Sequence, residues 1–482
     1  MWNYLDVHFK KESLRPLAVV FAIKFPLFLL FAYYFHAYSA SNASINYFFT
    51  ISGDTRGYYF PCEQFFLGNG YTSVCRMPGL LPIYYCLRVF CSPAWTQTII
   101  VFLQFIGDAV ATYLLAQIAW WVSKNAKAFW LVLIGYSLSY FVAVWNHVGY
   151  SDSFAVSMLI SSVYFLLKFK RSDRFIHLML SALLLTWSVF FRPLHGLLVP
   201  IYLMFFLLDY KRPLASLKTA SIFLLPLIFF LGLWTLKNYR QTGRIIILQD
   251  SMSSCSSSIP PQMLAMRELI IAWGEDIQPW TKGSAAAWFF LKRYADSRDA
   301  SRLASYQTSS CSLDSLIALK YNFHASRTVS NTASERKAFA QIAIDQSRRF
   351  LQSYRMEHPV RAYFFNRLIL LTRFLLPSRL DNLPLPSFDQ MSLFQKSIKI
   401  FYYFFLLAIN LFGFLACLYF LYKKHYLVLV PLFFLIGLPV FFGYIEQRYL
   451  TPVYPFFLLF SVLACLNLSQ LLNNDKLKST RQ

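Results

Sequence analysis

Residues 400–422 read IFYYFFLLAINLFGFLACLYFLY, and Lys423 and Lys424 follow at once. The stretch contains no charged side chain. About 20 such apolar residues are needed for a helix to cross the hydrocarbon core of a bilayer. This segment therefore predicts a transmembrane helix.

Similar apolar stretches recur along the whole chain. Hydrophobic residues make up 57% of the 482 residues and charged residues only 14%, whereas a soluble domain carries roughly a quarter charged residues. We predict an all-α polytopic membrane protein with about ten transmembrane helices. The predicted spans are 16–38, 95–121, 129–147, 153–169, 175–191, 193–209, 219–236, 397–422, 426–443 and 449–468. A short apolar segment at 79–90 is expected to lie at the membrane interface.

The distribution of basic residues predicts the orientation, because lysine and arginine accumulate in cytoplasmic loops. With a cytoplasmic N-terminus, every inside loop is basic: these loops contain Lys124, Lys127, Lys168, Lys170, Arg171, Arg174, Lys211, Arg212, Lys218, Lys423, Lys424, Lys476, Lys478 and Arg481. Both termini are thus expected in the cytoplasm, with an extracytoplasmic active site, and the compact loops favour a bacterial inner membrane. The net charge of +23 reflects topology and attraction to membrane lipids, and no nucleic-acid motif accompanies it.

This topology divides the chain into three regions. Residues 1–236 form an N-terminal transmembrane module, with a first extracytoplasmic loop at 39–94. Residues 237–396 form a large, mainly helical extracytoplasmic loop domain. Residues 397–482 form the C-terminal transmembrane helices and a cytoplasmic tail.

Four cysteines fall in the outward loops. An oxidising compartment would permit the pairs Cys62–Cys75 and Cys255–Cys311, while free thiols are an equal alternative. No cofactor is predicted. A divalent metal is compatible with the sequence, but no ligand motif indicates one.

Two acids are expected at the outer membrane surface. Asp54 lies in the first outward loop, and Asp152 in the short second one. Each has an ordinary alternative, since Gly53-Asp54 is common turn chemistry and Asp152 could cap a helix. Two carboxylates on one face nevertheless make a catalytic site plausible.

Cations that could bind phosphate lie at the same surface: Arg192, Lys237 and Arg448. Each could instead extend toward lipid phosphates. Within the predicted spans, Asp108 is expected to form an interhelical hydrogen bond, and Lys24 to extend toward the membrane edge. His147 could assist proton transfer, although a structural role is more common for a single histidine.

The order of these motifs resembles one family. They are Gly53-Asp54 with Tyr58, Gly68-Asn69-Gly70, Arg76-Met77-Pro78-Gly79, Asp152, Arg192-Pro193, Lys237-Asn238-Tyr239 with Gly243, His358-Pro359, and Glu446-Gln447-Arg448-Tyr449 with Pro452 and Pro455. Together they resemble the GT-C fold, polyprenyl-phosphate-sugar-dependent membrane glycosyltransferases, which include the dolichyl-phosphate-mannose protein mannosyltransferases and the lipid A aminoarabinose transferases. The resemblance covers nearly the whole chain.

The resemblance implies an inverting transfer of a sugar from a polyprenyl phosphate to a hydroxyl of a lipid, glycan or protein acceptor. Asp54 would be the general base and Asp152 would orient hydroxyls. Arg192, Lys237 and Arg448 would bind the donor phosphate, while Arg56, Tyr58, Arg76, Glu446 and Tyr449 would contact donor or acceptor. Two departures weaken the match: Thr55 and Arg56 follow Asp54 where many relatives have a second acid, and position 237 is lysine where relatives often have arginine.

Three other functions are compatible with the sequence. A transporter or flippase would use Asp108 and Lys24 along a pathway. A polysaccharide polymerase or ligase would transfer whole oligosaccharides from a lipid carrier. A non-catalytic assembly protein would tolerate loss of both Asp54 and Asp152.

Overall fold

The chain was analysed as a computed structural model that describes residues 14–38, 48–50, 55–149, 152–207, 213–248, 260–277, 284–291, 301–376, 388–437 and 447–479. Across these ranges the chain is helical, with two isolated β-bridges and no named strand. It divides into two compact units. The first comprises Met1–Gln249, Ser378–Phe434 and Arg448–Gln482, and the second comprises Asp250–Pro377 and Leu435–Gln447.

Five helices of the first unit are long and apolar enough to cross a membrane. They are α2 (Leu14–Tyr38), α5 (Pro93–Ser123), α8 (Asp152–Ser172), α11 (Pro213–Thr242) and α18 (Leu393–Tyr422). A sixth candidate joins α6 (Ala126–Leu138) to the stretch Tyr140–Asn146 through a 45° bend. The bend follows from Ser139, which leaves helical geometry and accepts a hydrogen bond from the backbone N–H of Phe141. The prediction of an all-α chain with several membrane-compatible helices is confirmed.

The other four predicted spans coincide with shorter apolar helices. These are α9 (Phe175–Phe191), α10 (Val199–Leu207) with the 3-10 turn before it, α19 (Leu429–Gly437) with its own preceding turn, and the apolar part of α20 (Tyr454–Ser479). The total of ten spans therefore stays a prediction. The segment predicted at the interface forms α4 (Leu81–Phe90).

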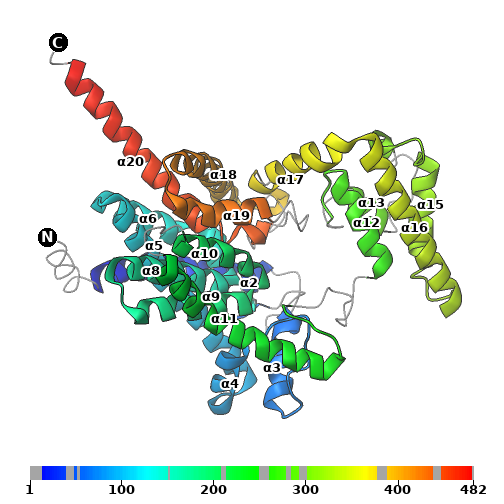
Figure 1. Cartoon of the computed structure of the whole chain (residues 1–482), viewed down its shortest axis with the longest axis horizontal. Helices are drawn as coiled ribbons and strands as arrows, with labels where there is room; N and C mark the ends of the chain where they lie inside the picture. Colours follow the sequence, from blue (N-terminus) through cyan, green and yellow to red (C-terminus); the bar gives the residue numbers. More distant parts are fainter. Residues whose placement is uncertain are drawn as a thin grey trace. The chain divides into compact units, whose positions relative to one another are not determined.

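Helices α8 and α9 lie side by side as an antiparallel hairpin (Figure 1). Serine side chains hydrogen-bond the two helices to each other. The Oγ atoms of Ser162 and Ser181 each donate to the other residue's carbonyl, at 2.8 and 2.9 Å. Nearer the other end, Ser188 Oγ donates to the carbonyl of Ala155 at 2.8 Å. Small side chains let two helix backbones approach closely within a membrane. The hairpin brings the start of α8, which is Asp152, beside the residue that follows α9, which is Arg192.

A buried ion pair joins α2 to α5. Lys24 Nζ lies 2.6 Å from Asp108 Oδ2, and both side chains are almost completely buried. Asn146 Nδ2 donates to the same carboxylate oxygen at 3.2 Å. The predicted interhelical bond of Asp108 is thus present. The prediction that Lys24 extends to the membrane edge is wrong, because its ammonium is satisfied inside the helix bundle.

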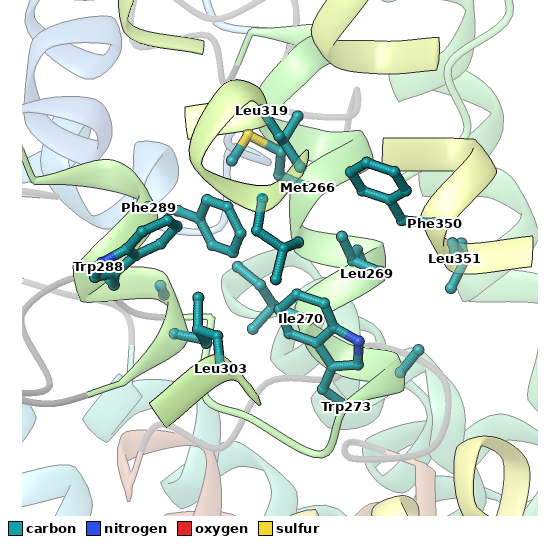
Figure 2. Close-up of a cluster of buried hydrophobic side chains, with 14 of the residues drawn as sticks. Met266, Leu269, Ile270, Trp273, Trp288, Phe289, Leu303, Leu319, Phe350 and Leu351 are labelled. Atoms are coloured by element: carbon teal, nitrogen blue, oxygen red, sulfur yellow. The ribbon is translucent and has the colours of Figure 1, made fainter. Parts of the chain in front are cut away.

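The second unit has a hydrophobic core of its own (Figure 2). Its helices are α12 (Pro261–Ala272), α13 (Ala285–Phe290), α15 (Leu313–Ala325), α16 (Ala333–Glu357) and α17 (Asn366–Leu375). Met266 and Leu269 of α12 pack in the same cluster as Leu319 and Phe350 from α15 and α16. Apolar side chains spaced three and four residues apart share one helix face, which explains why these helices bury the faces they do.

Both predicted disulfide pairs are wrong. Cys62 and Cys311 are free, buried thiols, whereas Cys75 is disulfide-bonded. Cys255 lies outside the described residues. Burial raises the pKa of the Cys62 thiol well above its ordinary value and that of Cys311 to about 12, so neither thiol is reactive near neutral pH.

Candidate functional site

A short parallel bridge brings together the segments that precede the two predicted acids. Thr50 N donates to the carbonyl of His147 at 2.8 Å, and Gly149 N donates to the carbonyl of Thr50 at 3.2 Å. Thr55, the first residue of α3 (Thr55–Phe66), is buried against Gly149. Asp54 itself lies outside the described residues, but its sequence neighbours Thr50 and Thr55 both contact the segment leading to Asp152.

Gly149 makes this close approach feasible. A Cβ atom at position 149 would lie 2.5 Å from Phe49 Cζ and 2.7 Å from Thr55 Cγ2. Both neighbouring side chains are buried and cannot readily move aside. Glycine is therefore required at position 149 by close packing. The sequence Val148-Gly149-Tyr150 alone does not indicate this requirement.

We predict that Gly149→Ala lowers the free energy of unfolding by about 1–3 kcal/mol, because the added methyl overpacks a filled site. The measurement is thermal unfolding of parent and variant purified in the same detergent. Gly232→Ala is the matched control, since a Cβ there meets nothing within 4 Å and alanine favours a helix interior by about 1 kcal/mol. Equal stability of the two variants would contradict the packing role of Gly149.

The centre of the site is the ion pair between Asp152 and Arg192. Arg192 Nη2 donates to Asp152 Oδ2, and both residues are buried, with 4% of Asp152 and 9% of Arg192 exposed. Burial by itself lowers the pKa of the Arg192 guanidinium, but the Asp152 carboxylate raises it, and the net pKa lies above the ordinary value. The Nε atom of Arg192 is buried without a hydrogen-bond partner among the described residues. One donor of this fixed cation is therefore available to a ligand.

A second guanidinium meets the first at the ring of Tyr58 on α3. Arg76 Nη1 donates to Tyr58 Oη at 3.2 Å, and its guanidinium carbon lies 4.8 Å from the ring centroid. The guanidinium carbon of Arg192 lies 5.9 Å from the same centroid. Aromatic faces attract such cations. Tyr58 thus holds Arg76 and Arg192 in one neighbourhood.

Lys237 lies on the last turns of α11, which continues to Thr242 beyond the predicted end at 236. Its Nζ donates to the carbonyl of Ser73 at 2.6 Å and lies 4.7 and 5.4 Å from the ring centroids of Trp234 and Tyr71. The hydroxyl of Tyr71 donates to the carbonyl of Arg76 at 2.9 Å. Lys237 therefore binds the loop that carries Arg76.

Arg448, the third cation predicted to bind phosphate, influences the pKa of Arg192. Arg448 and Tyr449 belong to a 3-10 turn, Gln447–Leu450. The positive charge of Arg448 lowers the pKa of Arg192, and the Tyr449 hydroxyl raises it. These effects require both groups to lie within electrostatic reach of Arg192.

The remaining predicted residues are not described within this cluster. Arg56 is exposed on α3. Asp54 and Glu446 lie outside the described residues. His147 is buried, its Nδ1 lies 3.2 Å from the carbonyl oxygen of Phe48, which can only accept a hydrogen bond from it, and its ring stacks on Phe28. That environment favours a structural role for His147 over proton transfer.

Sequence reasoning missed Tyr71, Ser73, Trp234 and Gln241, which join the first outward loop to α11. Gln241 Nε2 donates to the carbonyl of Thr72 at 2.8 Å. One sequence pattern could have indicated part of this contact: Trp234 and Lys237 are three residues apart, and therefore share a helix face. Their partner loop could not be identified from sequence spacing.

Comparison with models of protein families, with characterised proteins and with solved structures found no match to this chain. The chemistry must therefore be argued from the residues themselves.

The described cluster is suited to an anion. Arg76, Arg192 and Arg448 supply three guanidiniums, and Asp152 pairs with Arg192. Arginine binds phosphate through a planar pair of donors, and buried cations act more strongly than solvated ones. Among the described residues no group of three or more histidine, cysteine or acidic side chains could hold a metal.

Proposed function

We propose that this protein is a membrane glycosyltransferase that moves a sugar, with inversion, from a polyprenyl phosphate to an acceptor hydroxyl on the extracytoplasmic face. The observation that carries the proposal is the buried Asp152–Arg192 pair, with Arg76 and Tyr58 beside it. Its guanidinium groups, including the Nε donor of Arg192, fit the phosphate of a lipid-linked donor. Its membrane setting fits the polyprenyl chain.

In this reaction the acceptor oxygen attacks the anomeric carbon as the bond from that carbon to the phosphate oxygen breaks. Asp54 takes the acceptor proton, and the leaving polyprenyl phosphate gains negative charge. Arg192, Arg76 and Arg448 stabilise that charge electrostatically, which is the largest contribution in many enzymes. Asp152 fixes the Arg192 guanidinium and presents its carboxylate to sugar or acceptor hydroxyls.

Lys237 has a different role in this proposal. Its contact with Ser73 and the rings of Tyr71 and Trp234 places it behind the Arg76 loop. It stabilises the loop conformation in which Arg76 reaches Tyr58. It is therefore assigned as a positioning residue in place of the direct phosphate ligand that the family resemblance implies.

The transporter function is less well supported, because Lys24 and Asp108 satisfy each other inside the bundle. The polymerase or ligase function uses the same anionic lipid carrier and remains the second candidate. The two transferases differ in what they move, a single sugar or an oligosaccharide.

The proposal is tested by supplying the purified protein with a panel of radiolabelled polyprenyl-phosphate sugars and a membrane extract as the source of acceptors. Label transferred one sugar at a time supports the proposed transferase. Products larger by whole oligosaccharide units indicate the polymerase or ligase. Absence of transfer from every donor by folded protein would reject glycosyl transfer.

A further inference from the structure

One helical segment of the second unit leaves its aromatic side chains uncovered. After α16 the chain continues through a π-helical turn, Arg361–Phe365, into α17. Three consecutive aromatics of that turn are more than half exposed: Tyr363 at 62%, Phe364 at 57% and Phe365 at 54%. Val360, Leu368 and Ile369 are also exposed. These six residues are called the aromatic face.

The aromatic face is not part of the hydrophobic core of the second unit. Leu370 and Phe374 of α17 are buried, and Asn366 Nδ2 donates to the carbonyl of Ala272 at 2.6 Å and to Tyr354 Oη at 3.1 Å. The π turn adds a residue to one helical turn, and it allows Asn366 to reach these partners while the three preceding aromatics point outward. The inner side of the helix is satisfied, so the aromatic face requires a partner of its own.

The charge of the same segment favours an anionic partner. Between positions 348 and 376 the basic residues are Arg348, Arg349, Arg355, Arg361, Arg367 and Arg373, and the one acid is Glu357. Glu357 already accepts hydrogen bonds from Ser309 and Ser353, while Arg373 is paired with Glu275 at 3.2 Å and does not add to the net charge. Exposed aromatics among arginines are typical of helices that lie in the headgroup layer of a bilayer.

We propose that the aromatic face docks into the headgroup layer of a membrane that contains anionic lipid. Tyr363, Phe364 and Phe365 insert at the boundary between headgroups and acyl chains, and the flanking arginines bind lipid phosphates. The second unit is thereby held to the membrane surface by its own contacts. This inference does not depend on glycosyl transfer.

The test is photo-crosslinking of the full chain in nanodiscs that contain a diazirine lipid, with or without phosphatidylglycerol. Trypsin releases residues 362–367, which carry the three aromatics, and residues 338–348, a control peptide from α16 with exposed Ile342. We expect lipid adducts on 362–367 and few on 338–348. Phosphatidylglycerol should raise the adduct yield on 362–367 roughly five-fold, the effect of one well-placed arginine.

The variant Phe364→Glu/Phe365→Glu should lose these adducts, while the matched Ile342→Glu variant should keep them. Both substitutions fall on exposed positions, and thermal unfolding verifies that each variant is folded. Equal labelling of the two peptides would overturn the proposal. If residues 362–367 were protected from hydroxyl radicals but carried no lipid adducts, protein and not lipid would cover the aromatic face, and the proposal would be overturned. An adduct yield that does not depend on phosphatidylglycerol would also overturn it.

Discussion

Asp54→Asn is expected to lower the rate of sugar transfer about 10²–10⁴-fold, the usual contribution of a positioned general base. Asparagine keeps the size of the side chain but cannot accept the acceptor's proton. Thr50 and Thr55, on either side of Asp54 in the sequence, contact the stretch that leads to Asp152. The measurement is the initial rate of transfer with the donor identified from the panel.

Asp173→Asn is the matched control for this substitution. Asp173 has a φ of 51° in the turn between α8 and α9, a conformation that asparagine adopts readily. We expect its transfer rate to equal that of the parent. If Asp54→Asn were folded and as active as Asp173→Asn, a base at position 54 would be excluded.

The second large effect is expected at the buried Lys24–Asp108 pair. Lys24→Met or Asp108→Leu alone should lower the free energy of unfolding by about 3–5 kcal/mol, because each leaves an uncompensated charge in the bundle. The double variant should regain most of this loss, since apolar side chains of similar volume replace a buried pair at little cost. Thermal unfolding in a fixed detergent measures all four proteins as a double-mutant cycle.

The partly exposed pair of Arg88 and Glu63 provides the control. Glu63→Gln should cost no more than about 1 kcal/mol, because solvent screens this pair. If the single variants of Lys24 and Asp108 lost as little free energy of unfolding as Glu63→Gln, a structural role for the buried pair would be contradicted. A stable double variant that lost all function would favour the transporter.

The apolar stretches were sufficient to predict the helical class and the positions of most long helices, since crossing lipid requires continuous apolar sequence. They could not predict the bend at Ser139 or the extension of α11 through Lys237. Those features depend on a serine cap and on contacts with the loop around Ser73. The first is a local cap and the second a tertiary contact, and neither leaves a periodic pattern in the sequence.

The sequence predicted which residue types form the site, but only some of the contacts between them. Asp152 and Arg192 were each assigned to the outer surface, yet sequence spacing gave no reason to pair them. Their pairing follows from the α8–α9 hairpin, whose serine hydrogen bonds set which ends meet. The alternative of free thiols holds for Cys62 and Cys311, since an oxidising compartment permits disulfides but does not fix which cysteines meet.

The β-bridge between Thr50 and Val148 can form only after residue 148 has been synthesised. Ribosomes add about 5–20 residues per second, so the first outward loop emerges several seconds before its partner segment exists. During that interval the loop lacks the backbone partners that His147 and Gly149 provide. The region around the Asp152–Arg192 pair is therefore completed only after α5, α6 and the bent segment have been synthesised, and a ribosomal pause within them would leave the first loop open to proteases.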